Sequence, residues 1–414
     1  MSRKKHSRKP TRTNLSVLAQ LCNLIPKNKV AKLARQFGVH TKARTFSPWS
    51  HVVALLYAQF THSMSLNDVC DALRHHGSKL LRARKATAPS KNALSHANRN
   101  RDGAMAECLF WETLDHLKAS SPGFAGKTFK VPRGFRRAIH AVDSSTITLV
   151  AHCMDWARHR RRKAAAKLHL RLNVQSFLPT FAIVDTAADN DNKRARELCA
   201  GLQEGEIAVF DKAYVDFKHL SDLAKRGVFW VTRAKQGMKC RCPKRLIKKR
   251  DDNILRDDLI VLTGQNTKGH YPEALRRVRA LVEVDGRMIE MEFITNNLEW
   301  AAASIVALYK CRWRIEVFFK EIKQTLQLCD FLGHNKNAVQ WQVWTALLLY
   351  VLLRYQAFVH RWQHGFKRFF CLLRSSVWDG IPVQSLAKLY GTAEGIPSMR
   401  MAADQLFLPG FKRI

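Results

Sequence analysis

Between residues 137 and 233 the spacing of the apolar residues changes several times, and the order of these changes limits the folds open to the chain. Three segments have the β-branched residues or the period-two alternation of strands. A segment with helical spacing follows, then a strand, a helix and a final strand. The strands are expected within 137–150, 167–174, 179–185, 206–214 and 228–233, and the helices within 192–201 and 215–226.

This order of elements predicts an α/β fold with a ribonuclease H-like mixed-sheet core. Residues from about 234 to 293 interrupt the order with strand-like pieces and a basic run, so we expect an inserted β-rich subdomain there. A long helix is expected to begin after the Asn296-Asn297 turn, with Asn297 as its N-cap, and to run past Lys323. Trp300 is then expected on that helix.

The regions on both sides of this core have apolar residues three or four positions apart, as helices do. On the N-terminal side, Ser65 stands three positions before Asp68, a spacing typical of a helix N-terminus. On the C-terminal side, residues 338–375 are mainly apolar and are expected to pack on the core. The predicted organisation is a basic disordered arm (1–13), a helical N-terminal domain (14–130), the ribonuclease H-like core (131–335) and a helical C-terminal region (336–414).

The charge of the chain narrows the class of partner. Its 70 lysines and arginines outnumber 33 aspartates and glutamates, which gives a formal net charge of +37. An excess of this size repels itself unless a polyanion compensates it, and phosphate neutralisation makes nucleic acid the natural polyanion. A merely basic, soluble protein is the alternative, but the excess is spread along the whole chain.

Zinc proteins and membrane proteins fit the sequence less well. The ten cysteines are scattered, and Cys240 and Cys242 have no second pair at zinc spacing, so we expect free thiols in a reducing cytoplasm. The most apolar stretch, residues 343–353, is about half the length that spans a bilayer. We therefore expect a buried helix there, and neither a membrane nor a nucleotide cofactor as a partner.

Four polar residues late in the core, Tyr309, Arg312, Glu316 and Lys323, follow one another at offsets of 3, 4 and 7. On an α-helix, where each residue turns by about 100°, these offsets place all four on one narrow stripe. One acid among two cations and a phenol is what a surface needs to hold a metal ion beside a phosphate. Arg312 and Lys323 are suited to grip that phosphate.

Two aspartates upstream, Asp143 and Asp211, each belong to a β-like apolar run. Phosphodiester chemistry needs a nucleophilic oxygen, a stabilised leaving oxygen and neutralised charge at phosphorus, which two Mg²⁺ ions about 3.5–4 Å apart supply. Mg²⁺ prefers carboxylate oxygen and keeps several waters, so a few carboxylates from separate elements suffice. Asp143, Asp211 and Glu316 are thus the candidate catalytic and metal-binding residues of an enzyme that cuts and joins DNA.

Each acid also has an ordinary structural interpretation. An aspartate at the end of a strand is usually a cap or turn residue. Glu316 alone fits a surface ion pair with Arg312 or Lys320, which adds little stability. Only the pattern as a whole favours the catalytic interpretation.

Basic residues in two further segments are candidate DNA contacts. Arg160, Arg161, Arg162 and Lys167 lie between the first two predicted strands, near Asp143, and would contact phosphates with little sequence specificity. A solvated loop is the alternative for this segment.

A short helix that opens at Ser90 is the second of these segments. It has the residue types that contact phosphates and base edges, so it is a candidate recognition helix of a helix-turn-helix-like unit. An ordinary exposed helix is the alternative. The residues concerned are Lys91, His96, Asn98, Arg99 and Arg101.

Together these motifs resemble the DDE-class insertion-sequence transposases. The four residues of the stripe match the YREK signature of the IS-four type branch at every position and spacing. Asp143 in AVDSSTITL and Asp211 in VFDKAYVDF are similar to the family's aspartate motifs. Further similar segments are GVFWVTRAK, YPEALRRVR and FSPWSHVVALLYAQFTHSMSLNDV, so that the resemblance covers roughly residues 14–355.

The resemblance implies cut-and-paste transposition that depends on Mg²⁺, with Mn²⁺ as a substitute and two ions in the site. The implied steps are nicking at the element's end, hairpin formation by the freed 3′-OH, hairpin opening and strand transfer into target DNA. Tyr309, Arg312 and Lys323 would hold a DNA phosphate, while the three carboxylates ligate metal. A homodimer that bridges two double-stranded ends in a synaptic complex is implied, in a bacterial cytoplasm and associated with the nucleoid.

The sequence departs from this family at three points, one of them in the inserted subdomain, and leaves two other functions open. Relatives stack a flipped base on a tryptophan of the inserted subdomain, but here that segment reads EMEFITNN, with Phe293 and no tryptophan. The same fold would also serve a ribonuclease H-like nuclease without strand transfer. A DNA-binding repressor derived from a transposase is the other alternative, which the intact acids argue against.

Overall fold

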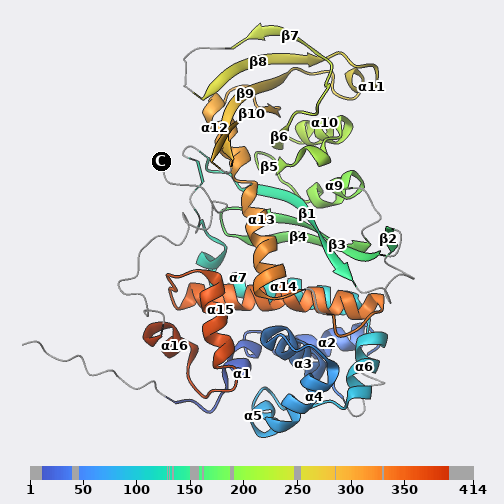
Figure 1. The fold of residues 1–414 in the computed structure, drawn as a ribbon, viewed down its shortest axis with the longest axis vertical. Helices are drawn as coiled ribbons and strands as arrows, with labels where there is room; N and C mark the ends of the chain where they lie inside the picture. Colours follow the sequence, from blue (N-terminus) through green and yellow to red (C-terminus); the bar gives the residue numbers. More distant parts are fainter. Residues whose placement is uncertain are drawn as a thin grey trace, which may run out of the picture.

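A twisted sheet lies on a body of helices, and the inserted strands extend the sheet away from that body (Figure 1). The computed structural model describes residues 12–39, 46–127, 129, 131–132, 135–149, 158–160, 163–186, 191–246, 253–284, 286–328 and 331–390. The basic arm therefore lies almost wholly outside the described residues, as does the end of the chain from residue 391 onward.

The core of the sheet is mixed, as predicted. Three strands pair antiparallel, with β3 between β1 and β4, and two more strands follow β1 in parallel, in the order β1-β5-β6. This arrangement confirms the predicted ribonuclease H-like mixed-sheet core. The strands are β1 (Ile139–Leu149), β3 (Lys163–Asn173), β4 (Leu178–Thr186), β5 (Ile207–Phe210) and β6 (Phe229–Arg233).

The segment predicted as a basic loop between the first two strands is partly strand. The short β2 (Arg158–Arg160) pairs with the start of β3, so the hairpin extends into the basic run. Residues 158–160 thus pair with β3 instead of forming the solvated loop that was the alternative interpretation, while Arg161 and Arg162 lie outside the described residues.

The insertion is β-rich, and its strands continue the core sheet. The last of them, β10, pairs antiparallel with β6, which makes one ten-stranded sheet. The inserted elements are β7 (Cys240–Arg245), β8 (Ile254–Leu262), α11 (Gln265–Lys268), β9 (Leu275–Val284) and β10 (Arg287–Thr295).

Different helices cover the two faces of the core sheet. On one face, α9 (Asp191–Cys199) and α10 (Phe217–Lys225) pack through a cluster that includes Val142 and Phe210. On the other face, α12 (Ala302–Lys310) and α13 (Trp313–Lys320) pack on β1, β5 and β6. Alternate strand residues point to opposite faces, so this division decides which residues can meet.

The predicted start of the long helix, at Asn297, is wrong. The side-chain oxygen of Asn297 accepts hydrogen bonds from the amides of Glu299 and Trp300, at 3.0 and 2.8 Å, and so caps a turn rather than the helix. The helix begins later, with Ala301 in extended conformation at its N-cap. Trp300 therefore precedes the helix, where its ring packs 5.1 Å from the ring of Phe229.

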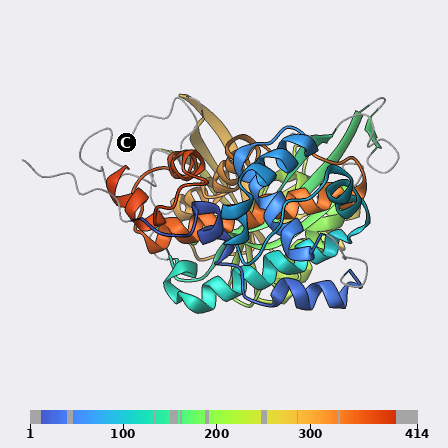
Figure 2. The same ribbon diagram turned by 90° about the horizontal axis from the view of Figure 1, so that it is seen from below.

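Helices from both ends of the chain form one body. The central α14 (Lys336–Val359) lies among the N-terminal helices in Figure 2, and a Cβ added at Gly103 would lie 2.6 Å from the Cβ of Gln340. The predicted cap at Ser65 is present as a capping box with Asp68. The other helices are α1 (Val17–Cys22), α2 (Lys29–Gln36), α3 (Pro48–Thr61), α4 (Leu66–His75), α5 (Gly77–Leu81), α6 (Lys91–Asn100), α7 (Gly103–Ser120), α15 (Phe366–Ser375) and α16 (Val383–Leu389).

The apolar run at 343–353 belongs to α14, which is longer than the run itself. By length and composition alone α14 would cross a membrane, but 72% of its most apolar window is buried inside the protein. It packs against α7 and α3, as the core helix of the helical body.

Candidate active site

The candidate site lies on the three parallel strands β1, β5 and β6, and their register decides which residues meet there. Val142 pairs with Phe210, and Val209 pairs with Val231. One residue beyond Val142 and Phe210, the chain brings Asp143 and Asp211 to the same level. Since Ala141 and Val209 face the α12–α13 side, the two aspartates face that side too.

The helical stripe lies over these two aspartates. The Tyr309 hydroxyl donates to Asp211 Oδ1 at 3.4 Å, and Arg312 Nη1 donates to Asp143 Oδ2 at 3.1 Å. Arg312 Nη2 donates to Glu316 Oε1 at 2.6 Å. The structure therefore brings together the three predicted acids and two of the predicted phosphate-binding residues.

Lys323, further along the chain, contacts β1, the strand that carries Asp143. Residues 321–325 form a π-turn directly after α13, and the Lys323 ammonium donates to the backbone carbonyl of Thr146 on β1. Backbone bonds also tighten at Arg312, whose amide donates to Tyr309 O at 2.9 Å, three residues back. Short 3₁₀ and π pieces within a helix often mark functional sites.

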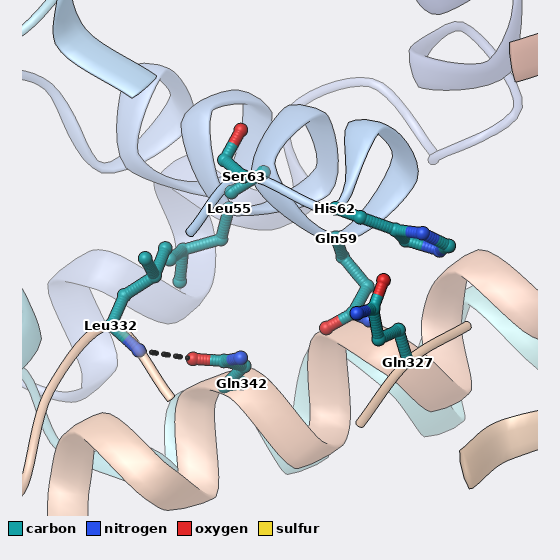
Figure 3. Close-up of a pocket in the computed structure, with 8 residues that line it drawn as sticks. Leu55, Gln59, His62, Ser63, Gln327, Leu332 and Gln342 are labelled. Atoms are coloured by element: carbon teal, nitrogen blue, oxygen red, sulfur yellow. Dashed lines mark hydrogen bonds between the residues drawn. The ribbon is translucent and has the colours of Figure 1, made fainter. Parts of the chain in front are cut away.

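The helical body contacts the end of the π-turn. The side-chain amide of Gln59 on α3 donates to Leu326 O, and Nε2 of His62, the residue that caps the C-terminus of α3, lies 3.1 Å from Thr325 O. Figure 3 shows Gln59 on α3 and His62 at its C-terminal end, with Gln342 on α14 accepting from the amide of Leu332 at 2.9 Å. The segment that carries Lys323 is thus held from the N-terminal part of the chain.

Burial changes the titration of the site. The pKa of Asp143 is raised to about 6, mainly by burial, against the opposing charge of Arg312 and with repulsion from Asp211 and Glu316. The pKa of Tyr309 is raised to about 12, again mainly by burial, so it stays a phenol at neutral pH. Burial also lowers the pKa of Lys323.

Arg312 lies between two of the acids. Burial alone would lower the pKa of its guanidinium, but Tyr309, Glu316 and Asp143 outweigh burial and raise it. The side chain is only 10% exposed, whereas that of Glu316 is 42% exposed. A full positive charge therefore bridges Asp143 and Glu316.

The donor set suits Mg²⁺, because three carboxylates from three elements converge and repel one another until a cation compensates them. As they stand, no group of three His, Cys, Asp or Glu side chains in the described part of the chain is close enough to hold an ion. The guanidinium of Arg312 is the cation between Asp143 and Glu316 instead. The side-chain chemistry of the three acids therefore fits Mg²⁺, while their present positions are those of partners of Arg312.

Comparisons with known proteins support the same assignment. Residues 134–352 match the model of the transposase DDE domain, which is more than half of the chain. The chain belongs to the DDE transposase family. The family predicted from the signature residues is thus confirmed, and residues 13–83 also match a domain of unknown function, DUF4372.

Three curated relatives are transposases. The chain is 32% identical to the putative transposase y4zB of Sinorhizobium fredii, over 66% of this chain and 73% of that one. It is 28% identical to the probable transposase for insertion sequence element IS5377 of Geobacillus stearothermophilus, over 53% and 57%. It is 26% identical to transposase InsG for insertion sequence element IS4 of Escherichia coli, over 46% and 43%. The matches thus span less than two thirds of the second and third relatives.

One solved structure is similar to a lesser degree. The piggyBac transposase synaptic complex with hairpin DNA has a TM-score of 0.41 and 10% identity, over 98% of this chain and 89% of that one. Nothing about this transposase follows from so weak a likeness.

Arg233 of the transposase is a site residue that the sequence did not reveal. It follows Val231 on the same face of β6, level with Asp211, and its charge is near enough to affect the pKa of Tyr309. Phe293 pairs with Arg233 across β6 and β10, and its ring lies 4.9 Å from the Tyr309 ring. The sequence feature that could have identified Arg233 is its position at the end of a predicted strand, as Asp211 stands at the end of another.

Phe293 itself is buried. Only 1% of it is exposed, and it packs against Tyr309. Its ring supports the phenol from behind and is not presented to solvent for stacking a base.

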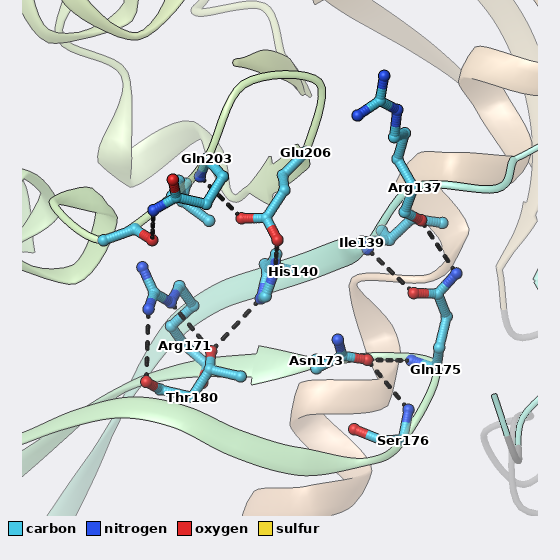
Figure 4. Close-up of polar contacts among 12 residues, drawn as sticks. Arg137, Ile139, His140, Arg171, Asn173, Gln175, Ser176, Thr180, Gln203 and Glu206 are labelled. Atoms are coloured by element: carbon cyan, nitrogen blue, oxygen red, sulfur yellow. Dashed lines mark hydrogen bonds and ion pairs between the residues drawn. The ribbon is translucent and has the colours of Figure 1, made fainter. Parts of the chain in front are cut away.

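A polar network supports β1 on the face away from the acids. His140 Nδ1 lies 3.3 Å from Thr180 Oγ1, and His140 Nε2 lies 3.5 Å from Glu206 Oε1 (Figure 4). Arg171 Nε donates to Thr180 Oγ1 at 2.9 Å, and its Nη1 donates to Leu198 O at 2.9 Å. The network joins three strands to α9 just before Asp143.

Of the basic candidates near β1, Lys167 does not join the acids. Lys167 pairs with Thr146 and Asp185, and it alternates with Ala166 and Leu168, which face α12 and α13. Lys167 therefore points to the opposite face from Asp143. Arg160 lies on β2, at the outer end of the same hairpin.

The candidate recognition helix, α6, is only partly available. Asn98 is buried, with Oδ1 2.8 Å from His51 Nε2. Arg101 is also buried and donates to Phe46 O at 2.6 Å, so these two stabilise the fold and cannot contact DNA as predicted. Lys91, His96 and Arg99 are exposed. In Figure 1, α6 lies on the helical body, away from α12 and α13.

Proposed function

We propose that this transposase carries out metal-dependent cut-and-paste transposition of the element that encodes it. It nicks the element's end, forms a hairpin by attack of the freed 3′-OH on the opposite strand, opens the hairpin and joins the end to target DNA. The observation that supports this most directly is the convergence of Asp143, Asp211 and Glu316 on the side chains of Arg312 and Tyr309.

Each residue has a role that follows from its place. Asp143 on β1, Asp211 after β5 and Glu316 on α13 would hold two Mg²⁺ ions, or Mn²⁺ in their place. When bound, the ions neutralise charge at phosphorus and stabilise the entering and leaving oxygens. Arg312 and Lys323 would bind the phosphate next to the cut.

Tyr309 and Arg233 complete the phosphate site in this proposal. Tyr309 stays protonated at neutral pH and can donate to a phosphate oxygen. Arg233 adds a cation at the level of Asp211, on the same face of the sheet. A guanidinium offers paired donors that match phosphate oxygens.

Double-stranded DNA is the proposed partner, as element end and as target. The net charge of +37 favours binding to phosphates, and the exposed residues of α6 offer Lys91, His96 and Arg99 to the DNA outside the site. A homodimer in a synaptic complex would hold two ends together. The proposal places this reaction in a bacterial cytoplasm, on the nucleoid.

Cleavage of the gene's own flanking ends tests the proposal. DNA with these ends is incubated with Mg²⁺ and the native protein, Glu316→Ala, or Glu299→Ala. Glu299 is exposed and precedes the helix, so it serves as a matched control. Metal-dependent nicks or hairpins at the element boundary, lost only in Glu316→Ala, are expected.

Two other results would reject the proposal. Cleavage without joining of 3′ ends to a target would indicate a nuclease. Binding without cleavage by the native protein would indicate a repressor.

A further inference from the structure

The guanidinium of Arg312 occupies the acids that a metal ion would need. It donates to Asp143 Oδ2 at 3.1 Å and to Glu316 Oε1 at 2.6 Å, from opposite nitrogens. Both acids are proposed metal ligands, and a carboxylate oxygen that faces a guanidinium at this distance is not open to an ion. Metal and guanidinium therefore compete for the same oxygens.

This position leaves Arg312 incompletely bonded. Its Nε is buried and has no hydrogen-bond acceptor among the described residues. A buried donor without an acceptor is unfavourable. The guanidinium would therefore be more stable against a fuller set of hydrogen-bond acceptors. A phosphate provides such a set, because its oxygens accept paired donors from a guanidinium.

The site is open on the side where a phosphate would arrive. The side chain of Glu316 is 42% exposed, while that of Arg312 beneath it is 10% exposed. Lys323 contacts β1 at Thr146, three residues beyond Asp143, and Tyr309 contacts Asp211, so a phosphate drawn to them would come within reach of Arg312. The phosphate would then hold the guanidinium of Arg312, and the two acids would be left to the metal ion.

We propose that Arg312 is a guard of the metal site, a term used here for the cation that holds Asp143 and Glu316 in the absence of DNA. A docked DNA phosphate draws the guanidinium away and frees both acids. Metal and DNA then bind cooperatively, and the enzyme holds little metal until a DNA end is in place. The inference rests on the proposed function, since it takes the acids as metal ligands.

The size of the effect follows from the populations. If the guard position is favoured by about ten to one without DNA, the apparent metal affinity is weakened about tenfold. Removal of the guanidinium, or its movement to a phosphate, would raise the apparent metal affinity by the same factor. Coupling of this kind is reciprocal, so metal would also tighten DNA binding by the same factor.

Mn²⁺ binding to the full chain tests the guard directly. Free Mn²⁺ is measured by electron paramagnetic resonance, with and without a pre-cut duplex that carries the gene's flanking end and a terminal 5′-phosphate. Arg312→Gln is expected to bind Mn²⁺ about tenfold more tightly than the native protein without DNA, and to gain nothing further from the duplex. The native protein is expected to gain that factor when the duplex is added.

Lys323→Gln is the matched control, because it removes one positive charge from the same site without freeing a carboxylate. Its Mn²⁺ affinity without DNA should change much less than that of Arg312→Gln. Equal tightening in both variants would overturn the guard in favour of a general charge effect. If Arg312→Gln fails to fold, Arg312→Lys replaces it, since a single ammonium cannot bridge both acids with the same geometry.

Asp143→Asn separates failure of this inference from failure of the proposed function. If Asp143→Asn loses Mn²⁺ binding but Arg312→Gln binds like the native protein, the metal site stands and the guard is wrong. If Asp143→Asn binds Mn²⁺ as the native protein does, the acids do not hold metal, and the proposed function fails with the guard.

Discussion

Glu321 and Arg354 form a buried ion pair at the first residue of the π-turn that carries Lys323. Glu321 Oε2 accepts from Arg354 Nη2 at 2.6 Å, and the side chains are 8% and 12% exposed. Arg354 Cζ lies 4.9 Å from the centroids of both the Phe177 and Phe366 rings. The charge is thus enclosed by one carboxylate and aromatic faces, which fixes the turn to α14.

Breaking this pair should destabilise the protein strongly. Glu321→Gln leaves the Arg354 guanidinium buried without its counter-charge, so we expect a loss of roughly 3–5 kcal/mol in the free energy of unfolding. Urea denaturation measures the loss, with Glu299→Ala as an exposed control. The double variant Glu321→Leu/Arg354→Met should recover most of it, because no uncompensated charge remains. A double variant as unstable as Glu321→Gln would show that the pair does more than balance charge.

The stability of the helical body should depend on pH through His51. His51 is fully buried beneath Trp341, with ring centroids 4.6 Å apart, and burial together with the charge of Arg101 lowers its pKa from 6.5 to about 3. Since the folded pKa is below the unfolded one, the contribution to stability is complete above pH 6.5. It is lost as the pH falls from there toward 3, because only the unfolded chain binds the proton.

Between pH 7 and pH 5 this single group should weaken folding by about 2 kcal/mol. Denaturant unfolding at both pH values measures the change for the native protein, His51→Gln and His96→Gln, an exposed histidine of α6. His51→Gln should lower the pH dependence by that amount, whereas His96→Gln should leave it unaltered. The buried His219, whose pKa is lowered to about 4 by burial, adds a similar dependence that all three proteins share. An equal pH dependence for native and His51→Gln would contradict the assignment.

Elements of the active site were predictable from the sequence because each depends on local pattern. Strand alternation identified the segments around Asp143 and Asp211, and helical spacing identified the stripe. Register was not predictable, since a shift of one residue moves a side chain to the other face of a sheet. Arg233 was missed for this reason, although its strand was predicted correctly.

A second limit of prediction from sequence is the choice between alternative roles for one polar side chain, as at Asn98, Arg101 and Asn297. Each has a side chain that serves equally well in capping, in DNA contact or in a buried hydrogen bond. Which of these it does depends on distant segments, such as α14 packing on α6. The sequence gives the residue type, but tertiary packing decides which groups stay exposed.

Burial predicts different effects on stability for Arg99, which is exposed on α6, and Arg101, which is buried at the C-cap of α6. Arg101→Ala removes a buried donor to Phe46 O and Ser47 O, so unfolding free energy should fall by roughly 1–3 kcal/mol. Arg99→Ala removes an exposed side chain and should leave stability within about 0.5 kcal/mol of the native value. If Arg99 contacts a phosphate, its loss lowers the salt dependence of DNA binding by about one counterion. A normal salt dependence in Arg99→Ala would remove it from the DNA surface.

Arg233→Gln should slow cleavage without unfolding the protein. Arg233 lies at the level of Asp211 and makes no ion pair with another described residue, so its charge is available for a phosphate. Loss of one charge-assisted contact of about 1.5–3 kcal/mol corresponds to a roughly tenfold to hundredfold slower reaction. Single-turnover cleavage of the flanking-end DNA measures the rate, with Arg241→Gln, on the exposed edge strand β7, as the control. If both variants cleave at the native rate while Lys323→Gln is slow, the phosphate is held by the helix alone and the β6 cation has no part in it.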